Sequence, residues 1–148
     1  MLKKMKWAIN FVVLTFIASC GKEIPPPPTN TELLVNATWK FQSASAAGTD
    51  ISNNAAITCI KDDVITFNAS GNGTIAEGAV VCSPTTAAAF TWSFQNSETT
   101  LNMSHGLFPG GSGTFNIISL TETTLTISQN VTIPPSATAI PVTAVYIH

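Results

Sequence analysis

The connections between successive apolar runs alternate between long and short from residue 37 to the end of the chain. The runs are rich in threonine, valine, isoleucine and aromatic residues and are broken by glycine, asparagine and proline, which is typical of short β-strands. In an up-and-down meander, successive connections lie at opposite ends, so all the long ones would gather at one end. The sequence therefore predicts an all-β, eight-stranded antiparallel up-and-down barrel with one elaborated mouth. The strands are predicted at 37–46, 60–68, 73–80, 89–96, 99–104, 114–120, 123–130 and 140–147.

Cys59 and Cys82 lie at equal distances from a predicted tight turn at Ser70-Gly71. A two-residue hairpin at that turn would place the two cysteines opposite each other, close to disulfide range. We therefore predict a Cys59–Cys82 disulfide, with two free thiols or a bond to Cys20 as the alternatives. An immunoglobulin-like sandwich, the alternative fold, expects a tryptophan between its cysteines. None lies between Cys59 and Cys82.

Large apolar side chains recur on one face of the predicted strands, as in the run Phe90-Thr-Trp92-Ser-Phe94. In a barrel this face points inward. Two interpretations remain open: the side chains line a cavity for a small apolar ligand, or they fill the interior, because an eight-stranded barrel can be just wide enough for its own side chains. The candidate lining residues are Trp39, Phe41, Phe67, Phe90, Trp92, Phe94 and Met103.

Leu107 and Phe108 lie in the long connection 104–113, which also contains four glycines. The glycines give this connection backbone freedom, which comes at an ordering cost. As a functional lid, the two side chains would supply apolar contact to a ligand or partner. As a plug, they would fold back into the barrel and belong to its core. Both interpretations remain open at the level of sequence.

Three lysines precede an apolar run over 7–18 that is too short to span a bilayer as a helix. The segment Ile17-Ala18-Ser19-Cys20 that completes this leader resembles the lipobox of bacterial lipoproteins. In those proteins the cysteine receives diacylglycerol and becomes the acylated N-terminus, with palmitate as a typical acyl chain. We expect residues 1–19 to be a lipoprotein signal peptide and Cys20 to be lipidated. A plain secretory signal with an incidental cysteine is the alternative.

Residues 20–35 are expected to form a proline-rich tether, and residues 36–148 the barrel domain. Four consecutive prolines, Pro25 to Pro28, favour a semi-rigid polyproline II spacer of about 3.1 Å per residue. The chain is thus expected to be exported and held at a cell membrane by its lipid anchor. Gly21, in place of an aspartate, at the second mature position is compatible with the outer membrane. The periplasmic face and the cell surface both remain open.

Composition argues against nucleic acid and against catalysis. Without residues 1–19 the chain keeps three lysines and eight acidic residues, 3 − 8 = −5, whereas nucleic-acid binding needs clustered cations. The one acidic pair, Asp62-Asp63, would point to opposite faces of a strand. His105 and His148 are far apart, and no cluster has the spacing of metal ligands. We therefore expect no enzyme, no metal and no cofactor.

The segments NATWKF, CIKDDVITFNASGNGT and FTWSF resemble the lipocalin-like domain of small Gram-negative lipoproteins. The likeness covers about 36–148 and implies a lipocalin-type barrel that binds a small apolar ligand. The family often has a glycine near Asn36 or Ala37, which this chain lacks. The expected function is that of a membrane-anchored lipocalin-like lipoprotein, and the alternative is a non-enzymatic structural or protein-interaction lipoprotein that presents its mouth loops. The matching positions are Trp39, Cys59, Asp62, Asp63, Phe67, Gly71, Cys82 and Trp92.

Overall fold

Strands of the chain form one antiparallel sheet that closes on itself in a computed structural model, which describes residues 25–108, 111–132 and 137–148. Apart from β2, each strand pairs with the next strand along the chain, and β1 also pairs with β9, which closes the barrel. The two-residue β2 only extends β1 at one end. The predicted eight-stranded up-and-down barrel is therefore confirmed. The strands are β1 (Thr38–Ala46), β2 (Thr49–Asp50), β3 (Val64–Phe67), β4 (Asn72–Ala76), β5 (Ala88–Gln95), β6 (Thr100–Met103), β7 (Thr114–Leu120), β8 (Thr124–Val131) and β9 (Ile140–Ile147).

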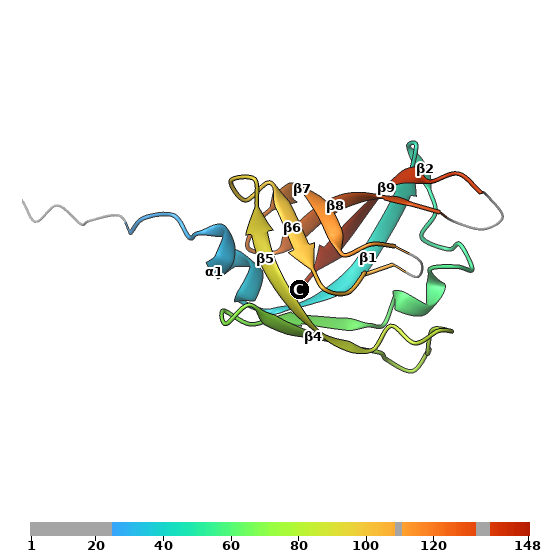
Figure 1. Cartoon of the computed structure of the whole chain (residues 1–148), viewed down its shortest axis with the longest axis horizontal. Helices are drawn as coiled ribbons and strands as arrows, with labels where there is room; N and C mark the ends of the chain where they lie inside the picture. Colours follow the sequence, from blue (N-terminus) through green and yellow to red (C-terminus); the bar gives the residue numbers. More distant parts are fainter. Residues whose placement is uncertain (1–24, 109–110, 133–136) are drawn as a thin grey trace, which may run out of the picture.

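The long connections lie together at one end of the barrel, as the alternation of loop lengths predicts (Figure 1). We call this end the mouth. The opposite end holds the tight turns β3–β4, β5–β6 and β7–β8. The short helix α1 (Asn30–Val35) also lies at this closed end, where the chain enters the barrel. The mouth therefore faces away from the N-terminal segment.

The predicted pairing register of β3 and β4 is wrong by one residue. Val64 pairs with Ala76 and Phe67 with Gly73, so paired positions sum to 140 and not to 141. The reason is the turn, in which the Gly71 amide donates to the Asn68 carbonyl and Gly71 adopts a φ of +80°. This geometry favours glycine and centres the turn on residue 70. The strands are also shorter than predicted, since a 3-10 turn, η1 (Thr58–Ile60), precedes β3.

Residues 30–35, which we predicted within the tether, form helix α1 and contribute Leu34 to the core. Thr29 and Glu32 form a capping box: the Thr29 hydroxyl accepts from the Glu32 amide, and the Glu32 carboxylate accepts from the Thr29 amide. The helix so begun buries Leu34 completely. Its Leu34 carbonyl accepts a 2.8 Å hydrogen bond from the indole of Trp39. In the described part of the chain, no helix has the length and hydropathy needed to cross a membrane.

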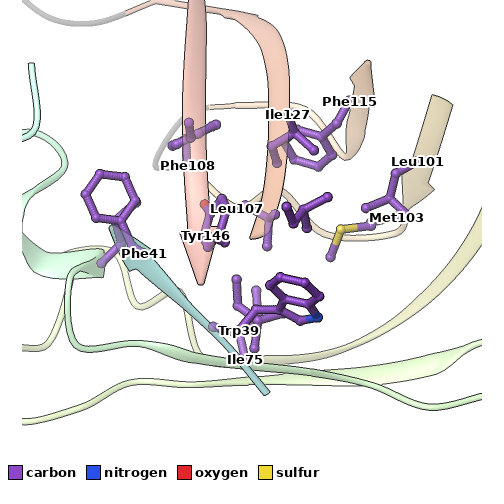
Figure 2. Packing of buried hydrophobic residues seen from close by; sticks show 14 of the residues in the cluster. Trp39, Phe41, Ile75, Leu101, Met103, Leu107, Phe108, Phe115, Ile127 and Tyr146 are labelled. Atoms are coloured by element: carbon purple, nitrogen blue, oxygen red, sulfur yellow. The ribbon is translucent and has the colours of Figure 1, made fainter. Parts of the chain in front are cut away.

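Inward-facing side chains from all around the barrel pack into one core (Figure 2). Gly73 shows how tight this packing is, because a Cβ there would lie 2.3 Å from the ring of Phe90. Only glycine leaves room for that ring. The largest side chains that are fully buried are Trp39, Tyr146, Phe67, Phe115, Leu34, Leu101, Leu125, Ile127 and Val142.

Candidate functional site at the barrel mouth

The predicted lining residues lie in the barrel core. Six of them, Trp39, Phe41, Phe67, Phe90, Trp92 and Met103, are at most 9% exposed, and Phe94 is partly buried against the same cluster. Their rings contact one another edge to face. The ring centroids of Phe67 and Phe90 lie 5.4 Å apart, and those of Phe67 and Trp92 lie 5.7 Å apart. Such contacts add to the stabilisation from burial. The arrangement favours a filled interior over a hollow one.

Leu107 and Phe108 fold into the mouth and are 4% and 3% exposed. Figure 2 shows both side chains among the other buried side chains of the core cluster. The Phe108 ring also contacts Phe115 of β7, with ring centroids 6.3 Å apart. The structure thus corresponds to the plug interpretation and not to an exposed lid. We call Leu107 and Phe108 the mouth plug.

A second feature of the mouth is the connection between β4 and β5, residues 77–87, which we call the mouth loop. The Glu77 carboxylate accepts hydrogen bonds from the amides of Cys82 (2.9 Å) and Thr86 (3.0 Å), and from the hydroxyl of Thr85. These bonds, led by that of the Thr85 hydroxyl, lower the pKa of Glu77 to about 2. Glu77 is therefore ionised at neutral pH and holds the loop by charge-assisted hydrogen bonds.

The disulfide fixes the mouth loop from the other side. Cys59 lies in η1 and Cys82 in the loop, with their Cα atoms 5.1 Å apart. The predicted Cys59–Cys82 bond is confirmed, although neither cysteine lies in a strand and the register used to predict it is wrong. The Asp62 carboxylate also accepts a 3.0 Å hydrogen bond from the Val80 amide. The loop is thus held at residues 77, 80 and 82.

Two valines at the tip of this braced loop face solvent. Val80 is 54% exposed and Val81 is 64% exposed. Among the described residues, Ile118 on β7 is the other large hydrophobic side chain with such exposure, at 58%. Sequence analysis missed the valines because they were predicted to continue or follow a strand. The signal against that prediction was Glu77-Gly78, since both residue types fit loops better than strand centres.

Asp63 is the buried acidic residue of the mouth, at 4% exposure. Its Oδ2 lies 2.8 Å from the hydroxyl of Thr86, which anchors the end of the mouth loop. Burial raises the pKa of Asp63, and the nearby negative charges of Glu77 and Asp62 raise it further. Burial also raises the pKa of the Tyr146 hydroxyl, and electrostatic repulsion from Asp63 adds a smaller increase.

The two histidines were predicted to lie far apart, and in the structure they lie at opposite ends of the barrel. His105 lines a shallow mouth hollow of about 140 Å³ together with Thr86 and Phe108. His148 packs at the closed end against Trp39, with ring centroids 4.2 Å apart. Asp62 and Asp63 precede β3 and do not lie in a strand as predicted, and both carboxyl groups accept hydrogen bonds from the mouth loop. Within the described residues, no group of histidine, cysteine or acidic side chains is arranged to hold a metal ion.

A family model described as lipocalin-like domain matches residues 35–127. The matched segment begins at the end of α1 and runs into β8, so it includes the mouth loop, the mouth plug and both cysteines of the disulfide. A search of curated proteins found no match to the chain.

Proposed function

Because the chain belongs to the lipocalin-like domain family, we propose that it is a lipid-anchored, non-enzymatic lipoprotein that presents its mouth loop to a protein partner. A lipocalin-like barrel suits a ligand-binding or a structural role. One contrast at the mouth favours protein binding over ligand binding. Leu107 and Phe108 fill the opening, whereas Val80 and Val81 are exposed on a loop that hydrogen bonds and the disulfide hold in place.

A braced apolar tip suits protein binding because little conformational entropy is lost when it docks. The Glu77 carboxylate, the Asp62 carboxylate and the disulfide already hold the loop in one conformation. The two acidic residues also place negative charge beside the valines. The partner that fits this surface offers an apolar cleft for Val80 and Val81 with lysine or arginine at its rim.

The lipid anchor completes the proposal. Cys20 lies outside the described residues, so the anchor rests on the lipobox resemblance. Pro25 to Pro28 are exposed and precede α1 at the closed end. A chain tethered through these residues would stand on its closed end, with the mouth directed away from an outer membrane. Partners would then reach the mouth loop without obstruction from the lipid surface.

A second candidate function is the binding of a small, mainly apolar molecule inside the barrel. The observation in its favour concerns buried polar atoms. Within the described part of the chain, Asp63 Oδ1, Gln129 Oε1 and Tyr146 Oη have no hydrogen-bond partner. A ligand with a polar group could satisfy them, because buried polar groups are normally hydrogen-bonded. Entry would require the mouth plug and its neighbours in the core to move.

We expect a photoreactive diazirine residue at position 81 to form one discrete cross-linked product with a protein in the native host. Val80→Ser should abolish that product without changing the melting temperature, because Val80 is exposed. The matched control is the same photoreactive residue at position 118, which is exposed to a similar degree on β7. An identical product from positions 81 and 118, or one insensitive to Val80→Ser, would argue against the mouth loop as the docking surface.

A further inference from the structure

The Thr86 hydroxyl lies between two carboxyl groups. Its Oγ1 is 2.8 Å from Asp63 Oδ2 and 3.0 Å from Glu77 Oε1. A hydroxyl has one proton to donate, and an ionised carboxylate has none. Both contacts can therefore be full two-centre hydrogen bonds only if one of the two carboxyl groups is protonated and donates to Thr86. If both were ionised, the two carboxylates would have to share one proton.

The surroundings of the two carboxyl groups decide which one carries the proton. Glu77 accepts from the amides of Cys82 and Thr86 and from the Thr85 hydroxyl, a set of donors that favours the ionised form. Asp63 is almost fully buried, and its Oδ2 has the Thr86 hydroxyl as its side-chain partner. Two negatively charged groups act on Asp63: Glu77 from the mouth loop and the adjacent Asp62. Tyr146 of β9 also interacts with Asp63 and is neutral. Burial and the two negative charges outweigh the hydrogen bonds from the Thr86 hydroxyl and the Gly78 backbone, so the protonated form of Asp63 is favoured.

We propose that the Asp63 carboxyl is protonated in the folded barrel and donates to the Thr86 hydroxyl, which in turn donates to Glu77. This Asp63–Thr86–Glu77 chain locks the mouth loop onto the barrel, and loss of the Asp63 proton releases the lock. After that loss, Thr86 can satisfy only one of two negative carboxylates, and these repel each other. The disulfide still retains Cys82, so the loop loosens without leaving the mouth.

Ionisation of Asp63 sets the upper pH limit of the lock, and protonation of Glu77 sets its lower pH limit. The pKa of Asp63 is raised in the folded chain, so its stabilising contribution is complete below the usual 3.8 and is lost as the pH rises through the folded value. The pKa of Glu77 is lowered to about 2, so its contribution is complete above 4.5 and is lost as the pH falls through about 2. The Asp63–Thr86–Glu77 chain is therefore intact between the folded pKa of Glu77, about 2, and the raised folded pKa of Asp63. Control of partner docking by this lock rests on the function proposed above.

The location of the proton can be measured on the full chain in detergent micelles with ¹³C-labelled aspartate. We expect the Asp63 carboxyl carbon to titrate at a higher pH than an ordinary aspartate. The exposed Asp50, whose pKa is lowered by the Ser52 hydroxyl, serves as the internal control. An Asp63 midpoint within or below the ordinary range would overturn the proposal. This measurement involves no partner. Its failure would therefore leave the cross-link at position 81 unaffected, and a failed cross-link would leave the Asp63 titration unaffected.

Hydrogen exchange of the Cys82 amide, which donates to Glu77, reports on the lock itself. After correction for intrinsic exchange, its protection should fall about fivefold as Asp63 ionises, as expected for the loss of one ordinary hydrogen bond. Asp63→Asn keeps a donor for Thr86 but cannot ionise, so it should keep the protection and remove its pH dependence. Thr86→Val should give low protection at every pH. Protection in the unmodified chain that does not change across the Asp63 titration would refute the lock.

Discussion

Replacing Leu107 and Phe108 together by serine is expected to lower the melting temperature of the domain by about 15 °C or more. Both side chains are buried in the mouth and belong to the barrel core. Large-to-small changes at such positions cost about 2–5 kcal/mol each, and the two neighbours will not add independently. A combined loss of about 4–10 kcal/mol is comparable to the total stability of many single domains. Circular dichroism during heating measures the change.

The matched control for this double variant is Ile118→Ser. Ile118 is a large apolar residue of β7, but it is 58% exposed. Its replacement should change the melting temperature by no more than about 2 °C, because exposed positions contribute little. The lid interpretation would instead be supported if the double variant had the same melting temperature as the control and lost partner or ligand binding.

Cys20→Ala is expected to abolish incorporation of labelled palmitate and to release the chain from the membrane fraction. Each buried methylene of an acyl chain contributes about 0.8 kcal/mol, and stable anchoring takes more than one chain. A diacylglycerol plus an amide-linked acyl chain would thus hold the protein almost permanently. Its loss leaves no comparable attachment in the sequence-based account, so the change in membrane association should be nearly complete.

The cysteine control separates lipidation from disulfide chemistry. A Cys59→Ser, Cys82→Ser double variant removes the disulfide but keeps Cys20. It should still incorporate the label and remain with the membrane. A Cys20→Ala chain that continues to take up palmitate would show that the lipobox assignment is wrong.

The sequence was sufficient to predict the barrel because its topology depends on loop lengths and alternation, which are local features. It was not sufficient for the β3–β4 register. There a one-residue difference depends on whether the turn is centred on Ser70 or between Ser70 and Gly71. The disulfide prediction is correct despite that error because Cys59 and Cys82 lie outside the paired strands, on either side of the hairpin.

Helix α1 could have been predicted, since Thr29 and Glu32 have the spacing of a capping box. We predicted an extended tether there because of the proline run that precedes the helix. The positions of Leu107 and Phe108 could not have been predicted, because their burial depends on contacts with strands that are distant in sequence, such as that of Phe108 with Phe115. The lock at Thr86 depends likewise on Asp63 and Glu77, which meet only in the folded barrel.

The most direct test of the account is native mass spectrometry of residues 25–148, purified from the native host. This segment keeps the Thr29 cap and the complete barrel. If side chains fill the interior and the mouth is plugged, the folded domain should have the mass of the polypeptide with one disulfide and no bound molecule. A stoichiometric small-molecule adduct, lost on collisional activation and absent after unfolding, would contradict the packed barrel and favour a ligand-binding cavity.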